Sequence, residues 1–139
     1  MYKRILVAND GSAGATQALE AAVAIAARLG AELHMIAVEE LPRFPASIDE
    51  VAEEQDEAEH RLAPVLARAR ERAGRAQVKL ETHLVAGHVV EAIVEFIKAR
   101  DVDLLVVGFM GHSQLYARII GSTTDRLVRL APCAVLVVK

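Results

Sequence analysis

The chain has 139 residues and a net charge of −3, and this length favours a single domain. With 53% hydrophobic and 25% charged residues, it can bury a substantial core and remain soluble. Its 16 lysines and arginines form no basic patch and only 4% of its residues are aromatic, so a nucleic-acid-binding surface is excluded.

The apolar runs and the single cysteine bear on where the protein works. No apolar stretch reaches the roughly 20 residues of a membrane span, so no membrane insertion is predicted. Residues 1–5 lack the apolar run and cleavage site of a signal peptide. Cys133 is the only cysteine, so no internal disulfide can form, and its apolar neighbours indicate a small core residue. We therefore expect a cytoplasmic protein.

The first part of the chain predicts a strand, a helix and a second strand. Residues 5–8 are a short apolar run closed by a turn signal at 9–11, which is typical of a buried strand. A helix follows and stops at Gly30, and residues 32–38 predict the second strand. The apolar face of the helix consists of Leu19, Ala22, Val23, Ala26 and Leu29.

A loop at 41–45 separates the second strand from a long helix pattern that runs from Val51 to Ala69. Pro64 lies inside this pattern. An interior proline removes a backbone hydrogen bond and costs about 3 kcal/mol, so we expect a kink or a restart there. The segment is acidic at 49–59 and arginine-rich at 61–75, which we interpret as a solvated helix face rather than a docking surface.

The rest of the chain repeats the alternation of strand and helix. Strand patterns lie at 78–85, 103–107 and 134–138, and helix patterns lie at 87–99 and 122–130. This alternation over residues 1–139 predicts one α/β domain, with a parallel sheet covered by helices on both faces. Right-handed crossovers wind the five strands most simply in the order 3-2-1-4-5.

The winding of the chain reverses between the first and fourth strands of this order. Ligands of open α/β sheets bind outside the carboxyl ends of the strands at such a reversal. The loops that meet there are 9–12, after the first strand, and the segment from Gly108, after the fourth. The topology therefore predicts a binding site at these two loops.

The segment Gly108 to Thr124 has the features of an anion site. Gly108 lets the backbone turn sharply or approach a ligand closely. Ser122 is the predicted N-cap of the last helix, and Asp125 three residues on resembles a capping box. Unpaired N–H groups at a helix start favour phosphate, and the segment contains no acidic residue. A glycine-rich turn followed by an ordinary helix cap would have the same spacing.

Two common nucleotide motifs are absent. The chain has no Gly-Lys pair, so it has no P-loop with a phosphate-binding lysine. Residues 10–14 differ from the GxGxxG pattern of dinucleotide-binding folds. No general base is apparent in 108–124, which predicts little or no hydrolysis of a bound nucleotide.

The spacing G-x2-G-x9-G-[ST], filled by Gly108, Gly111, Gly121 and Ser122, resembles the ATP-binding signature of the universal stress protein family. Other parts of that family are similar to residues 2–7 leading to 10–12, to 111–113 and to 131–138. The resemblance covers the whole chain. It implies an adenine nucleotide alpha-hydrolase-like, Rossmann-type fold and a small ATP-binding stress or regulatory protein.

The resemblance also implies which residues bind ATP or another adenine nucleotide. They are Ala8, Asn9, Asp10, Ala37, Val38, Val107, Gly108, Met110, Gly111, His112, Gly121, Ser122, Thr123 and Thr124. Asp10 would lie near the adenosine as a hydrogen-bond acceptor, with a metal ligand as the alternative role. An Asx turn at a strand end would use the same residue. Ala37 and Val38 are alternatives for the main-chain contact to adenine. His112 would contact phosphate when protonated, or be a simple loop residue.

Two further properties follow from the resemblance. Similar proteins often bind a divalent metal with the triphosphate, which implies Mg²⁺ or Mn²⁺, and they pair as dimers through the last strand. Residues 134–138 would form an apolar edge strand that a dimer covers. Phe109 and Met110 replace the more polar or basic residues usual between the first two glycines. This departure keeps open a nucleotide-free dimeric interaction module that uses the apolar stretch 115–120.

The five histidines show no metal-ligand spacing on a shared element. His34 and His83 fall within predicted strands and are interpreted as packing or surface residues. No metal-binding residue is assigned from the sequence.

Overall fold

The computed structural model of the chain describes residues 1–41, 48–109 and 120–139. Strands and helices alternate through it as predicted, and the predicted bounds of the last helix and strand are confirmed. The elements are β1 (Arg4–Ala8), α1 (Ala13–Leu29), β2 (Glu32–Glu40), α2 (Ile48–Arg75), β3 (Leu80–Gly87), α3 (Val89–Arg100), β4 (Leu104–Gly108), α4 (Ser122–Leu130) and β5 (Ala134–Val138). The predicted loop at 41–45 lies, apart from Leu41, outside the described residues.

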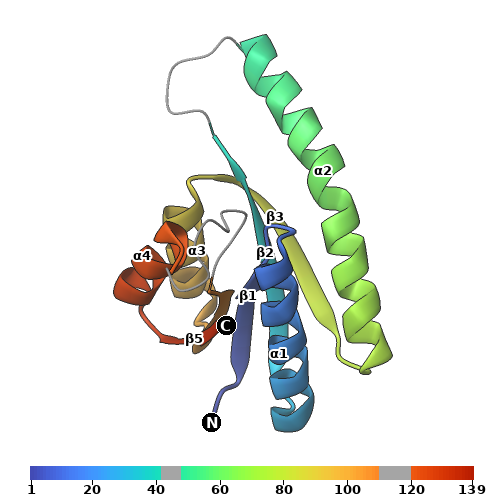
Figure 1. Cartoon of the computed structure of the whole chain (residues 1–139), viewed down its shortest axis with the longest axis vertical. Helices are drawn as coiled ribbons and strands as arrows, with labels where there is room; N and C mark the ends of the chain where they lie inside the picture. Colours follow the sequence, from blue (N-terminus) through green and yellow to red (C-terminus); the bar gives the residue numbers. More distant parts are fainter. Residues whose placement is uncertain (42–47, 110–119) are drawn as a thin grey trace.

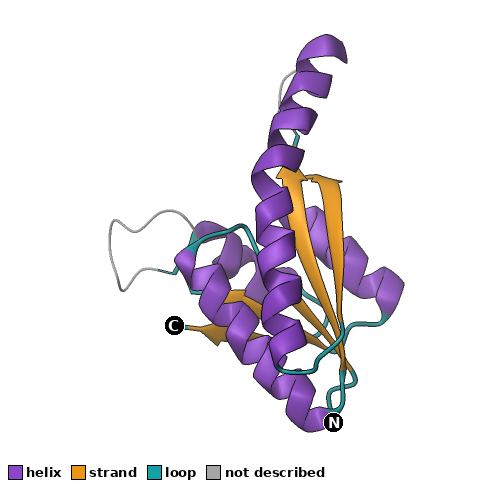
Figure 2. Cartoon of the chain, turned by 90° about the vertical axis from the view of Figure 1, so that its right-hand side faces the viewer, coloured by secondary structure: helices purple, strands orange, loops and turns teal. Residues whose placement is uncertain are grey.

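The strands form one parallel sheet of order β3-β2-β1-β4-β5, which confirms the predicted fold class (Figure 2). β1 is central and pairs with β2 on one side and with β4 on the other. The chain steps outward from β1 to β3 and then crosses back to β4 and β5. The loops after β1 and β4 therefore lead to opposite sides of the sheet, at the place that the sequence predicts.

Alternate residues of the central strands face opposite sides of the sheet; α1 and α2 cover one side, and α3 and α4 cover the other (Figure 1). Ile5 and Val7 of β1 pack with α1 and α2, whereas Leu6 packs with α3 and α4. All three side chains are fully buried. Burial of a side chain of this size contributes about 1.5–3 kcal/mol, so the two helix layers hold the strands in position.

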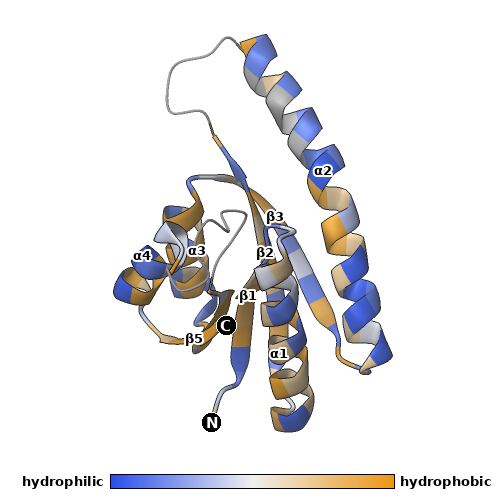
Figure 3. Cartoon of the chain, viewed as in Figure 1, coloured by the Kyte–Doolittle hydropathy of each residue, from blue (hydrophilic) through white to orange (hydrophobic). Residues whose placement is uncertain are grey.

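Most of the buried apolar residues of the helices face the sheet. Figure 3 shows orange strands in the interior and blue residues on the outward surfaces of the helices, most clearly along α2. Within the described ranges, no helix combines the length and the apolar content that crossing a membrane requires. Cys133 is half-buried against the α3 and α4 layer, and this burial raises the pKa of its thiol above the usual value.

The first helix is bounded by two caps. Ser12 is the N-cap, and its Oγ accepts a hydrogen bond from the backbone N–H of Ala15 at 3.2 Å. The helix ends at Gly30, which has φ 63° and confirms the predicted stop. The predicted inward position of Leu29 is wrong, because this last helical residue is 48% exposed. The described neighbours cover the earlier turns, up to Ala26, and leave the last turn uncovered.

The helix does not restart at Pro64, because α2 runs without interruption from Ile48 to Arg75. Pro64 lies on the exposed side of the helix, whereas Leu62, Val65 and Ala69 are buried. Their packing on both sides of the proline stabilises the helix across the missing hydrogen bond. Tertiary contacts thus outweigh the local cost.

β2 and β3 each end two residues later than predicted, and the predicted start of β3 at Val78 is wrong, because the strand begins at Leu80. Glu40 pairs with Gly87, and the N–H of Leu41 donates to the carbonyl oxygen of Gly87 at 3.1 Å. This extra pairing makes Gly87 the end of a strand instead of the start of a helix. The longer β2 also carries Glu40 beyond the carboxyl end of β1.

Gly108 ends β4 beside the first turn of α1. A Cβ atom on Gly108 would lie 2.7 Å from the backbone carbon and oxygen of Gly14 and 3.1 Å from the nitrogen of Ala15. Because these atoms belong to backbone, no rotamer change can relieve the collision. The glycine is therefore required for close packing of strand on helix.

We expect Gly108→Ala to lower the free energy of unfolding by about 1–3 kcal/mol, the usual cost of overpacking. Gly74→Ala is the matched control, because a Cβ there meets nothing within 4 Å. In a helix this control is expected to stabilise the protein by roughly 0.5–1 kcal/mol. Urea denaturation of the two variants tests the contact, and equal stability of both would contradict it.

Candidate functional site

A cavity of about 630 Å³ opens at the carboxyl ends of β1, β2 and β4. This volume lies within the roughly 300–1,000 Å³ of typical small-molecule sites. Its walls include ten of the residues predicted from the sequence: Ala8, Asn9, Asp10, Val38, Val107, Gly108, Gly121, Ser122, Thr123 and Thr124. The structure thus brings the turn after β1, the end of β2 and the start of α4 together around one space.

The turn after β1 is held by two side-chain acceptors. Asn9 Oδ1 accepts from the N–H of Gly11, and Asp10 Oδ1 accepts from the N–H of Ser12, both at 2.9 Å. The backbone N–H of Asn9 donates to the carbonyl oxygen of Ile36 at 3.0 Å, which ties the turn to β2. The Asx turn considered for Asp10 is therefore present, and the exposed Asp10 also lines the cavity.

The start of α4 differs from the prediction. Gly121 is the N-cap, with φ −61° and ψ 147°, and Ser122 is the first residue of the helix. The predicted capping box is wrong, because no side chain caps the helix and Asp125 instead contacts Arg129 at 3.3 Å. A glycine N-cap has no side-chain acceptor, so the first-turn amides keep their capacity to bind an anion.

The neighbouring helix starts are satisfied differently. Ser12 caps α1 through its hydroxyl. In α3, a hydrogen bond from its own backbone N–H, together with the Arg126 guanidinium, holds the pKa of the Glu91 carboxyl below its usual value. α3, like α4, has no side-chain cap, but the Glu91 carboxylate lies in its first turn. The start of α4 supplies Gly121, Ser122 and Thr123 to the cavity, so its amides are available to a negatively charged ligand.

Thr124 fixes the position of α4. Its hydroxyl donates to the carbonyl oxygen of Gly108 at 2.8 Å, and the side chain is buried. The N–H of Gly121 also donates to the carbonyl oxygen of Phe109 at 2.9 Å. Ser122 and Thr123 are exposed and line the cavity, so their side chains are accessible to a ligand there.

Four predicted site residues lie elsewhere or outside the described residues. Ala37 does not line the cavity; it is fully buried with Leu62 and Val65 under α2. Because residues of a strand alternate between faces, Val38 takes the cavity side instead. Met110, Gly111 and His112 lie outside the described residues.

Ser12, from the predicted loop 9–12, also lines the cavity. Several other lining residues were missed by sequence reasoning: Ala15, Ile36, Glu40, Arg61, Leu62, Val89, Ile93 and Leu127. Ile36 lies two residues before Val38 on the same strand face, so strand periodicity could have identified it. Arg61 carries no such signal, because its position depends on where α2 crosses the end of the sheet.

The cavity has both apolar and polar walls. Apolar walls come from β2, α3 and α4, through residues such as Ile36, Val38 and Ile93. The charged lining residues are Asp10, Glu40 and Arg61, and the positive end of the α4 dipole adds to Arg61. This arrangement can accommodate a ligand with an apolar ring and an anionic tail.

Comparisons with known proteins agree on one family. A model described as the universal stress protein family matches residues 1–139. A universal stress protein of Methanocaldococcus jannaschii is 31% identical over 147 residues, which cover 100% of this chain and 83% of that protein. The structure of universal stress protein UspA from Lactobacillus plantarum matches with a TM-score of 0.90 and 28% identity, covering 99% of this chain and 98% of that one.

A solved universal stress protein in complex with cAMP is also similar to this chain. It matches with a TM-score of 0.78 and 29% identity, covering 99% of this chain and 97% of that one.

The bond from Thr124 to Gly108 predicts a difference between two adjacent threonines. Thr124→Val leaves a part-buried carbonyl oxygen without its hydroxyl donor, so we expect a loss of about 1–3 kcal/mol in unfolding free energy. Thr123→Val, at an exposed position, is expected to change it by less than about 0.5 kcal/mol. Thermal or urea denaturation measures both. If the two variants are equally stable, the hydroxyl of Thr124 does not anchor α4.

Proposed function

The chain belongs to the universal stress protein family, and on that premise we propose that it is a cytoplasmic stress or regulatory protein that binds ATP or another adenine nucleotide. One observation carries the proposal: apolar walls and an uncapped helix start face the same cavity. A nucleotide has both an apolar ring and an anionic tail, so this cavity is complementary to it.

The adenine is proposed to lie at the end of β2. Ile36 and Val38 project into the cavity there, with Ala8 and Val107 from the two central strands beside them. Removing a planar base from water against such surface contributes about 25 cal/mol for each Å² of apolar area. A family member that is 29% identical was solved with cAMP, which supports an adenine nucleotide as the ligand class.

The phosphates are proposed to lie at the start of α4. The amides of its first turn have no side-chain cap, and the exposed hydroxyls of Ser122 and Thr123 can donate to phosphate oxygens. Arg61 supplies a positive charge to the same cavity. Met110, Gly111 and His112 remain part of the proposed phosphate site on the strength of the glycine spacing.

A Mg²⁺ or Mn²⁺ ion is proposed to accompany a triphosphate. Such ions are commonly held by one or two carboxylates together with phosphate oxygens. The carboxylates of Asp10 and Glu40 line the cavity, so the donor set fits this mode of binding. When bound, the ion would neutralise phosphate charge, while the amides of α4 orient the tail.

Binding of the nucleotide is proposed to act by shifting a conformational equilibrium of the protein, with little or no hydrolysis of the nucleotide. A ligand that binds one conformation more tightly increases its population by the difference in binding free energy. β4 and α4 both line the cavity, so a ligand that contacts both can favour one arrangement of these two walls.

The phosphate position predicts opposite effects of Thr123→Glu on folding and on binding. A carboxylate in the first turn of a helix is favourable by about 0.3–1 kcal/mol, so the fold is expected to keep its stability. The same charge would repel phosphates, and two unit charges 4 Å apart interact by about 4 kcal/mol at an effective dielectric constant of 20. We expect ATP affinity to fall at least about tenfold, a change of 1.4 kcal/mol, in isothermal titration calorimetry.

Thr123→Gln is the matched control, because it has nearly the same shape as Thr123→Glu without the charge. Its affinity for ATP is expected to stay close to that of the parent. Equal affinity of the two variants would show that the phosphates lie elsewhere. Absence of adenine nucleotide binding by the parent protein would favour the nucleotide-free interaction module.

A homodimer through β5 is the proposed assembly. β5 (Ala134–Val138) pairs with β4 on one side and is last in the sheet order, and it is composed of apolar residues. Such an edge invites pairing with a second strand. Leu136 in its centre is 36% exposed.

Leu136→Lys is expected to convert the dimer to a monomer, because lysine on an edge strand opposes strand pairing. Val128→Lys is the control, since Val128 on α4 is 46% exposed and lies outside β5. Light scattering coupled to size-exclusion chromatography measures the mass of each. A monomeric parent, or a dimer that survives Leu136→Lys, would contradict this assembly.

A further inference from the structure

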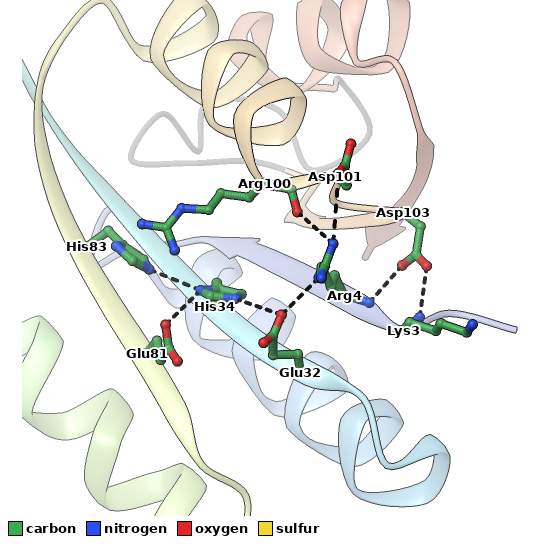
Figure 4. Close-up of polar contacts among 9 residues, drawn as sticks. All are labelled: Lys3, Arg4, Glu32, His34, Glu81, His83, Arg100, Asp101 and Asp103. Carbon is green, nitrogen blue, oxygen red and sulfur yellow. Dashed lines mark hydrogen bonds and ion pairs between the residues drawn. The ribbon is translucent and has the colours of Figure 1, made fainter.

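A cluster of potential metal ligands lies on the strands β2 and β3, as Figure 4 shows. His34 pairs in register with Glu81, and His83 lies two residues further along β3 on the same face. The His34 Nδ1 atom is 3.0 Å from His83 Nε2 and 3.5 Å from Glu81 Oε2. The three ligand atoms all lie within 4.8 Å of one another.

These distances match those between neighbouring ligand atoms in a tetrahedral metal site. Zinc binds histidine nitrogen and carboxylate oxygen at about 2.0–2.2 Å, so neighbouring ligand atoms of a tetrahedral site are about 3.3 Å apart. The two distances from His34 Nδ1, 3.0 and 3.5 Å, lie on either side of that value. An ion could therefore take the place of the proton between the two rings with shifts of a few tenths of an ångström.

We propose that His34 Nδ1, His83 Nε2 and Glu81 Oε2 form a binding site for a divalent transition-metal ion, with Zn²⁺ as the best match. Two imidazoles and one carboxylate are a common ligand set for zinc, and a water molecule would complete the tetrahedron. Mg²⁺ and Ca²⁺ are poor matches, because they prefer oxygen ligands.

A second layer of contacts orients His34. Its Nε2 contacts Glu32 Oε2 at 3.3 Å, and the guanidinium of Arg4 contacts the same carboxylate at 3.2 Å. An N–H at Nε2 donating to Glu32 leaves Nδ1 as the lone-pair nitrogen, facing His83 and Glu81. Histidine ligands of zinc characteristically donate their other ring N–H to a carboxylate in this way.

The surroundings restrict both ring movement and solvent. His34 is buried, and its ring stacks on that of His83 with centroids 5.3 Å apart. Phe96 of α3 packs on both rings, at 5.9 Å from His34 and 4.7 Å from His83. Glu81 is half-exposed, so an ion would enter from its side.

Charged groups of both signs surround the cluster, and the Asp101 carboxylate also contacts Arg4, at 3.9 Å. Glu32 and Glu81 are negative, and Arg4 and Arg100 are positive, with Arg4 engaged by Glu32 and the Arg100 guanidinium 5.2 Å above the Phe96 ring. Burial, followed by the charges of His34 and Arg100, lowers the pKa of His83.

The cluster is separate from the proposed nucleotide site. None of its three residues is among those that line the described cavity, and His34 precedes the cavity residue Ile36 by two positions. An ion bound here would link the edge strand β3 to β2, and would stabilise the fold because the unfolded chain lacks the assembled site.

The test uses the full chain, treated with EDTA and dialysed, and titrated with ZnCl₂ in a calorimeter at pH 7.5. One Zn²⁺ per chain and a raised melting temperature are expected. Co²⁺ is the spectroscopic probe, and it should show the visible d–d absorption of a tetrahedral complex. Loss of the site is expected in His83→Ala and in the isosteric variant Glu81→Gln.

Two further variants separate a built site from general histidine binding. His60→Gln removes an exposed histidine of α2 outside the cluster and should leave Zn²⁺ affinity unchanged. Glu32→Gln removes the orienting carboxylate and should lower affinity by about 10–100-fold. The site would be overturned if the parent protein bound neither Zn²⁺ nor Co²⁺. It would also be overturned if His83→Ala kept the parent's affinity for Zn²⁺, or if His60→Gln lost it.

Discussion

The close approach of β4 to α1 is the constraint on which the cavity depends. Gly108 leaves no room for a Cβ atom against the backbone of Gly14, so the end of β4 and the start of α1 are held together. The carbonyl oxygen of the same glycine accepts the hydroxyl of Thr124 and so positions α4. Gly108 thereby fixes the positions of α1 and α4, which both line the cavity. Its lack of a side chain is required for this packing, whether or not a ligand is bound.

Helix starts around the cavity differ in how their amides are satisfied, and this difference gives the site its polarity. Ser12 caps α1, and the Glu91 carboxylate accepts a backbone hydrogen bond in the first turn of α3. The N-cap of α4 is Gly121, which has no side-chain acceptor. Anions are therefore favoured at α4, whereas the apolar residues Ile36 and Val38 of β2 favour a ring. The proposed direction of the nucleotide follows from this asymmetry.

Away from the cavity, the pairing of β2 with β3 assembles chemistry of another kind. His34 and His83 are 49 residues apart in the sequence, and they meet because the parallel register places Glu81 opposite His34. Glu32 and Phe96 then hold the two rings in place. An edge strand with ligands on its inner face is a site where an ion would add a cross-link between strands.

The sequence by itself determined the α/β fold, the strand order and the loops at which the cavity lies, because period-2 and period-3.6 patterns and glycine spacing are local properties. The tertiary structure alone decided that Thr124 bonds to Gly108, that Arg61 reaches the cavity and that α2 continues through Pro64. It also decided that His34 meets His83. Each of these contacts depends on the packing and the register of elements that are distant in the sequence. Local sequence patterns do not contain this information.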